Sequence, residues 1–131
     1  MRLLLDTHIW IWSYLAPHKI GSEVTRELTN PGNDRFLPAV SVWEASVLLE
    51  RKRIQFKRDF GEWFLESKEE LSLNEVPVSW AVAHELRFAM PGYRDPADRF
   101  LVATAKVHDF TLVTADERLM KIPGLKVLAN R

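Results

Sequence analysis

The sequence contains no cysteine, so disulfide bonds, thiolate zinc sites and thiol catalysis are all excluded. No apolar run approaches the roughly 18 residues that a membrane-spanning helix needs. Asp6 interrupts the apolar N-terminal residues too early for the apolar segment of a secretory signal. From these absences we expect a cytoplasmic protein with no membrane partner.

The chain also lacks a net charge, because 18 basic side chains balance 18 acidic ones. Nucleic-acid-binding domains often carry a strong positive excess. Any contact between this chain and a phosphate backbone must therefore come from local basic patches. The 131 residues, of which 47% are hydrophobic, suit one ordinary globular domain, and we expect it to span residues 1–131.

Short apolar segments alternate with segments of helical character along the whole chain. The expected strands are residues 2–6, 36–37, 73–76, 112–114 and 126–128, and the expected helices are residues 7–15, 20–29, 41–51, 59–70, 79–88 and 95–107. This alternation indicates an α/β fold with a mainly parallel sheet that helices cover on both faces. In such sheets, ligands bind beyond the carboxyl ends of the strands.

Two of the expected strands end in a carboxylate, Asp6 in the first and Asp116 after the fourth. Two further acids, Glu44 and Asp98, share helical faces with apolar residues and should point toward the sheet. All four acids can therefore meet at one edge of the sheet. Because unpaired anions near a dry core are costly, such a cluster indicates a bound cation or raised pKa values.

Each acid also has an ordinary structural interpretation. Glu44 can complete a capping box with Ser41. Asp95 can be the N-cap of its helix with Asp98 reaching back to it, Asp116 can cap residues 117–121, and the first acid can simply end its strand. Acids at four corresponding ends of α/β elements, taken together, nevertheless favour a common site.

The chemistry of that site follows from its oxygen donors. Hard cations such as Mg²⁺ and Mn²⁺ prefer carboxylate and water oxygens. Four acids could hold one ion firmly and a second with the help of a substrate phosphate. This arrangement suits phosphodiester hydrolysis, in which the metal lowers the pKa of an attacking water and stabilises the leaving oxygen.

Four motifs in this order and spacing resemble the PIN-domain ribonucleases, and most closely the VapC-type toxins of bacterial toxin–antitoxin pairs. The motifs are LLLDTH at residues 3–8, SVWE at 41–44, RDPADR at 94–99 and LVTAD at 112–116. The resemblance implies a PIN-like three-layer α/β/α sandwich and a Mg²⁺- or Mn²⁺-dependent endoribonuclease. It assigns the catalytic and metal-binding positions to Asp6, Glu44, Asp98 and Asp116.

Three residues beside these acids are candidates for supporting roles. The resemblance places the hydroxyl before the last acid at Thr114, and Thr7 directly follows the first acid. Asp95 is an additional acid that we interpret as an N-cap first and as an outer ligand second. The last motif usually reads Thr-Asn-Asp in this family, and Ala115 replaces the asparagine here.

Basic residues near the acids are candidates for binding RNA phosphates. The densest basic run begins with Arg51, Lys52 and Arg53, which can equally be a solvated helix end. Arg94 and Arg99 flank the third acid, and can either contact RNA or balance the charge of the acids.

Each of two aromatic side chains beside the acids can have either a functional or a purely structural role. Trp43 precedes Glu44 and can stack on an RNA base or pack within the fold. The four histidines show no metal-ligand spacing, and His8 is a weak candidate for a general base.

The resemblance also implies a homodimer and a small VapB-like antitoxin that blocks the site. An apolar groove lined by the early helices could take an antitoxin helix.

Other functions fit less well. A phosphatase of the haloacid dehalogenase type needs a second Asp two residues after the first, and His8 stands there. A receiver-like module needs an acidic pair near the first acid and a lysine at the end of a late strand, and neither is clear. A catalytically degenerate PIN-like module that binds RNA or protein is the stronger alternative.

Overall fold

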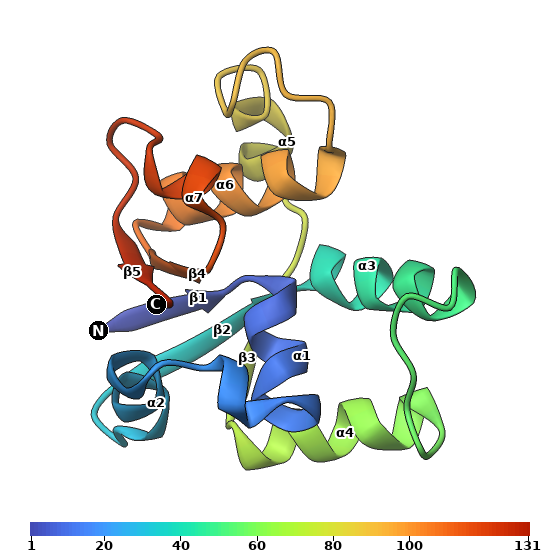
Figure 1. Cartoon of the computed structure of the whole chain (residues 1–131). Coiled ribbons are helices and arrows are strands. Elements are labelled where there is room, and N and C mark those ends of the chain that lie inside the picture. The colour runs from blue at the N-terminus through green and yellow to red at the C-terminus, as the bar shows by residue number, and fades with distance from the viewer.

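A five-stranded parallel sheet forms the centre of the protein, which we describe from a computed structural model of residues 1–131 (Figure 1). The order of its strands is β3-β2-β1-β4-β5. Their bounds are β1 (Arg2–Leu5), β2 (Asp34–Pro38), β3 (Leu73–Val76), β4 (Thr111–Thr114) and β5 (Val127–Ala129). All four neighbouring pairs are parallel, as the alternation of segments predicted.

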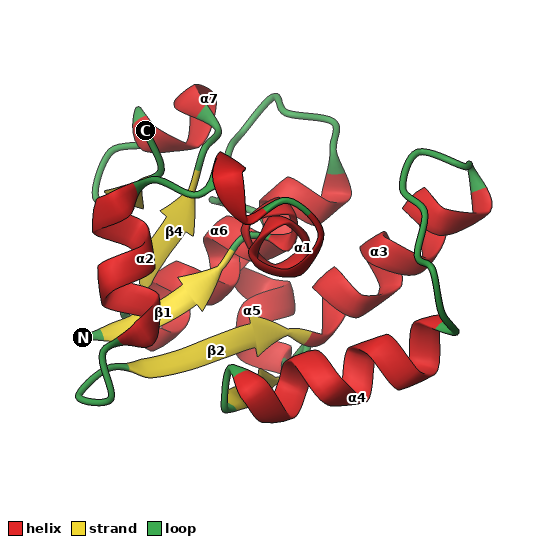
Figure 2. Ribbon diagram, turned by 60° about the horizontal axis from the view of Figure 1, so that its bottom comes forward, coloured by secondary structure: helices red, strands yellow, loops and turns green.

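Helices cover both faces of the sheet and complete a three-layer α/β/α sandwich (Figures 1 and 2). One layer contains α1 (Thr7–Leu15), α2 (Ser22–Thr29) and α4 (Phe60–Glu70), with a 3₁₀ turn at Pro17–Lys19. The other contains α5 (Trp80–Glu85), α6 (Pro96–His108) and α7 (Glu117–Met120). Helix α3 (Ala39–Glu50) extends beyond the end of β2. None of the helices combines the length and apolar character needed to cross a bilayer.

Strand β1 lies in the middle of the sheet because its side chains are apolar on both faces. Leu3 and Leu5 join the core that contains Trp10 and Trp63, whereas Leu4 joins the core on the opposite face. All three leucines are fully buried. A strand that is buried on both faces has consecutive apolar residues, and this explains the run of leucines near the N-terminus.

Helix α3 begins earlier than predicted, and the prediction of a capping box between Ser41 and Glu44 is wrong. Pro38 ends β2 and is itself the N-cap of α3, without a side-chain hydrogen bond. Ser41 is therefore buried inside the helix, and Glu44 lies in the second turn rather than the first. The Glu44 carboxylate has no capping role.

Candidate acidic site

All four acids singled out from the sequence line one cavity at the carboxyl edge of the sheet. Strands β1 and β4 are neighbours, with Leu5 opposite Val113, so the residues that follow them emerge side by side. The cavity has a volume of about 330 Å³. Its lining residues are Asp6, His8, Trp12, Glu44, Asp95, Asp98, Ala115, Asp116 and Arg118.

Asp6 connects the ends of the two central strands. It is the N-cap of α1 but makes no side-chain capping bond, so its carboxylate is free to face the cavity. The Thr114 hydroxyl donates to Asp6 Oδ2 at 2.6 Å and accepts the Asp116 backbone N–H at 3.0 Å. Burial raises the pKa of Asp6, and the hydrogen bond from Thr114 acts in the opposite direction.

Glu44 reaches the cavity from α3 and is half-buried. Burial raises the pKa of Glu44, and the negative charges of Asp6 and Asp95 raise it further. The neighbouring Thr7 side chain partly offsets these effects on the pKa. Both hydroxyl residues predicted to support the acids, Thr7 and Thr114, thus act directly on a carboxylate of the cavity.

Helix α6 contributes two acids with different roles. Asp95 is the N-cap, because its Oδ1 accepts the Ala97 backbone N–H at 3.0 Å, as predicted. Asp98 lies in the first turn and faces the cavity. Burial, followed by repulsion from Asp95 and Asp6, raises the pKa of Asp98 to about 6.

Arg118 is a site residue that sequence reasoning missed. Its Nη2 donates to Asp116 Oδ2 at 2.6 Å and to Asp98 Oδ2 at 3.0 Å, and its Nε donates to Asp116 Oδ1 at 3.1 Å. The guanidinium lowers the pKa of Asp116, which also caps α7 by accepting the Arg118 backbone N–H. The available signal was a basic residue two positions after the last acid.

The donors around the cavity are those of a hard-cation site. Five carboxylates and the His8 imidazole line the cavity, and the hydroxyls of Thr7 and Thr114 contact two of these carboxylates. As the side chains stand, no three acids or histidines are grouped so that they could hold a metal ion. A cation is nevertheless already present in the form of the Arg118 guanidinium, which pairs with two of the acids.

A second cavity of about 480 Å³ shares Glu44 and Asp95 with the acidic cavity. Arg51 and Arg53 line it, together with Trp43, whose side chain is 55% exposed. The fold therefore does not bury Trp43, and it places two of the predicted RNA-binding arginines near the acids.

The other basic candidates line neither cavity. Lys52 is exposed in the turn after α3, and Arg94 is exposed in the loop before α6. Arg99 is half-buried, and its Nη2 donates to the Leu86 carbonyl at 2.7 Å. This contact fixes α6 to the end of α5, so Arg99 has a structural partner.

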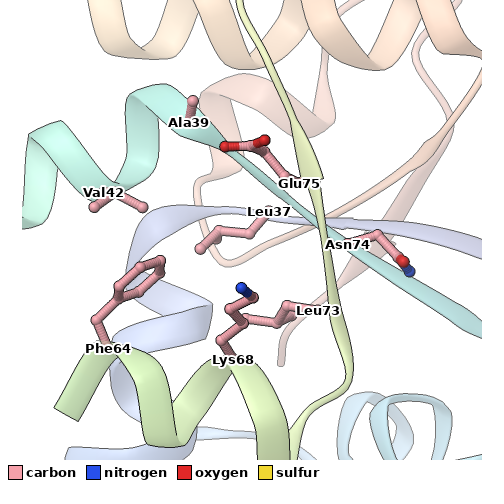
Figure 3. Close-up of a pocket in the computed structure, with 8 residues that line it drawn as sticks. All are labelled: Leu37, Ala39, Val42, Phe64, Lys68, Leu73, Asn74 and Glu75. Carbon is pink, nitrogen blue, oxygen red and sulfur yellow. The ribbon is translucent and has the colours of Figure 1, made fainter. Parts of the chain in front are cut away.

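A third cavity, of about 210 Å³, lies apart from the acids between β2, β3, α3 and α4 (Figure 3). Its walls are mostly apolar, with Leu37, Val42, Phe64 and Leu73 around the space. The Lys68 amine reaches into it from α4.

Fold and site together describe an α/β/α protein with an acidic cavity at the carboxyl edge of a parallel sheet. A family model described as PIN domain matches residues 3–125, and the chain belongs to this family. The chain is 31% identical over 118 residues to Ribonuclease VapC22 of Mycobacterium tuberculosis (strain ATCC 25618 / H37Rv). That match covers 89% of this chain and 88% of the relative.

Solved structures share the fold at lower sequence identity. VapBC2 from Rickettsia felis, bound to a DNA fragment from its promoter, has a TM-score of 0.72 at 16% identity and covers 100% of both chains. DNA-bound VapBC from Salmonella typhimurium has a TM-score of 0.70 at 16% identity, with 98% of each chain covered. A toxin–antitoxin complex from Klebsiella pneumoniae has a TM-score of 0.65 at 21% identity, covering 97% and 96%.

The raised pKa of Asp98 predicts that Asp98→Asn stabilises the metal-free protein at high pH. A carboxyl with a raised folded-state pKa stabilises the fold below its unfolded pKa, and this stability is lost as the pH rises through about 6. In EDTA at pH 8, we expect Asp98→Asn to raise the free energy of unfolding by about 1–2 kcal/mol, which is less than the full pKa shift implies because solvent screens this partly exposed group. At pH 4 the variant and the parent should differ little.

Urea denaturation at the two pH values measures this difference. Asp109→Asn is the matched control, because Asp109 is exposed, pairs with Lys126 and has a lowered pKa. Equal stabilities of Asp98→Asn and the parent at pH 8 would contradict the account.

Proposed function

We propose that this chain is a metal-dependent endoribonuclease that hydrolyses RNA phosphodiester bonds as the toxin of a toxin–antitoxin pair. The observation that carries the proposal is the cavity in which Asp6, Glu44, Asp98 and Asp116 converge from separate elements. Membership of the PIN domain family and the 31% sequence identity to a protein named as a ribonuclease support the proposal. We also propose that residues 1–131 act as one PIN-like domain.

We assign the four converging acids as the ligands of Mg²⁺ or Mn²⁺. A bound ion would activate a water for attack on the phosphodiester and stabilise the leaving oxygen. The Thr114 hydroxyl fixes the orientation of the Asp6 carboxylate, and Thr7 lies beside Glu44. Asp95 caps α6 and so holds the helix turn that carries Asp98.

The raised pKa values of three acids support a cation site. Asp6, Glu44 and Asp98 are all held where their anionic forms are disfavoured, mainly by burial. A bound divalent cation would offset this cost, because opposite charge favours the ionised carboxylate. Nucleases of the PIN family depend on divalent metal ions in general, which agrees with this chemistry.

A PIN-like module that binds RNA or protein without cleaving it is the alternative. The pairing of Arg118 with Asp98 and Asp116 favours this alternative, because a cation already neutralises two of the acids. The presence of all four acids in one cavity favours the enzyme.

Asp6→Asn should abolish RNA cleavage while leaving the fold intact. The amide keeps the size of the side chain but removes the charge that we assign to metal binding. Loss of product release from total RNA by at least about a hundredfold is expected, which corresponds to roughly 2.7 kcal/mol of lost transition-state stabilisation. EDTA should stop the parent enzyme, and added Mg²⁺ or Mn²⁺ should restore it.

Circular dichroism checks that Asp6→Asn folds, and Asp109→Asn serves as a control outside the cavity. Full cleavage by folded Asp6→Asn, or by the parent in metal-free buffer, would refute the proposed function. Metal binding without cleavage of any RNA would favour the binding module.

We further propose that the cavity between Trp43, Arg51 and Arg53 takes the nucleotides next to the cleaved bond. It adjoins the acidic cavity, with which it shares the lining residues Glu44 and Asp95. Arginines bind phosphate oxygens, and an exposed tryptophan ring can stack on a base of single-stranded RNA. We assign weaker RNA contacts to Lys52 and Arg94, which are exposed nearby, and none to the half-buried Arg99.

Trp43→Ala should weaken the binding of single-stranded RNA by about tenfold, because one base–aromatic stack is worth about 1–3 kcal/mol. Fluorescence anisotropy with a labelled oligonucleotide in Ca²⁺ measures the affinity. Trp80→Ala is the matched control, since Trp80 is 95% exposed and lies on α5. Equal losses of RNA affinity in both variants, or no loss in Trp43→Ala, would show that Trp43 does not contact RNA.

The partners of the chain belong to the same proposal. Similar structures are toxin–antitoxin complexes, and we propose a small VapB-like antitoxin and a homodimer for this chain. We propose that the apolar cavity beside Phe64 and Val42 binds a side chain of the antitoxin (Figure 3). Light scattering of the purified chain tests the dimer, and a monomer at micromolar concentration would count against it.

A further inference from the structure

The Arg118 side chain occupies an unusual position for an exposed arginine. About half of the side chain is exposed, at 54%, yet its guanidinium joins two acids from different elements. Asp116 precedes α7 and Asp98 lies in α6, so this single cation links two elements that line the cavity. The Arg118 guanidinium carbon also lies 5.9 Å from the centre of the Tyr93 ring.

The ion pairs of Arg118 matter because the cavity carries many more negative than positive side chains. Five acids line the cavity, and Arg118 is the only lysine or arginine among the lining residues. An RNA phosphate that approaches these acids meets electrostatic repulsion. The planar guanidinium is the one group here that can bind phosphate oxygens in a bidentate manner.

We propose that Arg118 is an exchangeable internal counter-cation. It holds Asp98 and Asp116 together in the metal-free protein, and it turns to an RNA phosphate when a divalent ion binds these carboxylates. The inference rests on the proposed function, because it takes both acids as metal ligands. In this proposal Arg118 competes with the metal for Asp98 and Asp116, and it contacts RNA once the metal has displaced it.

The exchange requires that the two ion pairs be easy to break. Ion pairs that involve an exposed arginine contribute little to stability, because water and salt screen them. A divalent ion attracts the same carboxylates with twice the charge and can displace the guanidinium. Arg118 remains charged in every state, since a guanidinium does not lose its proton in proteins.

Calorimetric titration with MnCl₂ in the absence of RNA tests the first half of the exchange. Arg118→Gln removes the competing cation, so Mn²⁺ should bind about fivefold more tightly than to the parent protein. Arg131→Gln is the matched control, because Arg131 is an exposed arginine that pairs with Glu117 outside the cavity. Unchanged or weaker Mn²⁺ binding by folded Arg118→Gln would overturn the proposal.

Anisotropy with a labelled single-stranded RNA in Ca²⁺ tests the second half. Arg118→Gln should bind this RNA about tenfold more weakly, since a hydrogen-bonded charge contact is lost. Arg118→Lys, which keeps the charge without the planar fork, should recover part of the affinity. Equal RNA affinities of Arg118→Gln and the parent would refute the role in RNA binding.

The two proposals fail in different ways. If the parent protein binds Mn²⁺ and cleaves RNA while Arg118→Gln matches it in both titrations, only the exchange is wrong. If the parent protein binds no Mn²⁺, both the metal site and the exchange are wrong. Thermal unfolding of each variant confirms that the comparisons are made between folded proteins.

Discussion

The crowding of carboxylates at one edge of the sheet is the interaction on which the site depends. Asp6 cannot leave this edge, because β1 is paired on both sides and its leucines are fully buried. Glu44 and Asp98 are carried toward Asp6 by helices that pack on the sheet. The fold thus holds like charges close together in a half-buried cavity, and the raised pKa values of these three acids express the cost.

A cation offsets part of the electrostatic cost of bringing these acids together. Arg118 offsets the charge of Asp98 and Asp116, whereas Asp6 forms no ion pair with a lysine or arginine and accepts a hydrogen bond from Thr114. Under the proposed exchange, a divalent ion would bind the two paired acids only as Arg118 is released. Metal binding and RNA binding are coupled through one guanidinium in this view.

The sequence predicts the sheet and the edge at which the acids meet, because apolar runs that end in a carboxylate report both burial and direction. The N-cap role of Asp95 is equally visible, since capping depends only on residues nearby in the chain. The capping box at Ser41 and Glu44 fails because Pro38 starts α3 early. The bond between Arg118 and Asp98 could not be predicted from the sequence, since it depends on how α7 is placed relative to α6.

The central claim is that these acids form a site which a divalent cation stabilises. Thermal unfolding of the protein at pH 8, with and without excess MnCl₂, tests this claim most directly, because a ligand that binds only the folded state raises its stability. We expect Mn²⁺ to raise the melting temperature of the parent protein and to leave that of Asp6→Asn unchanged. The same melting temperature of the parent protein in both buffers would contradict the account.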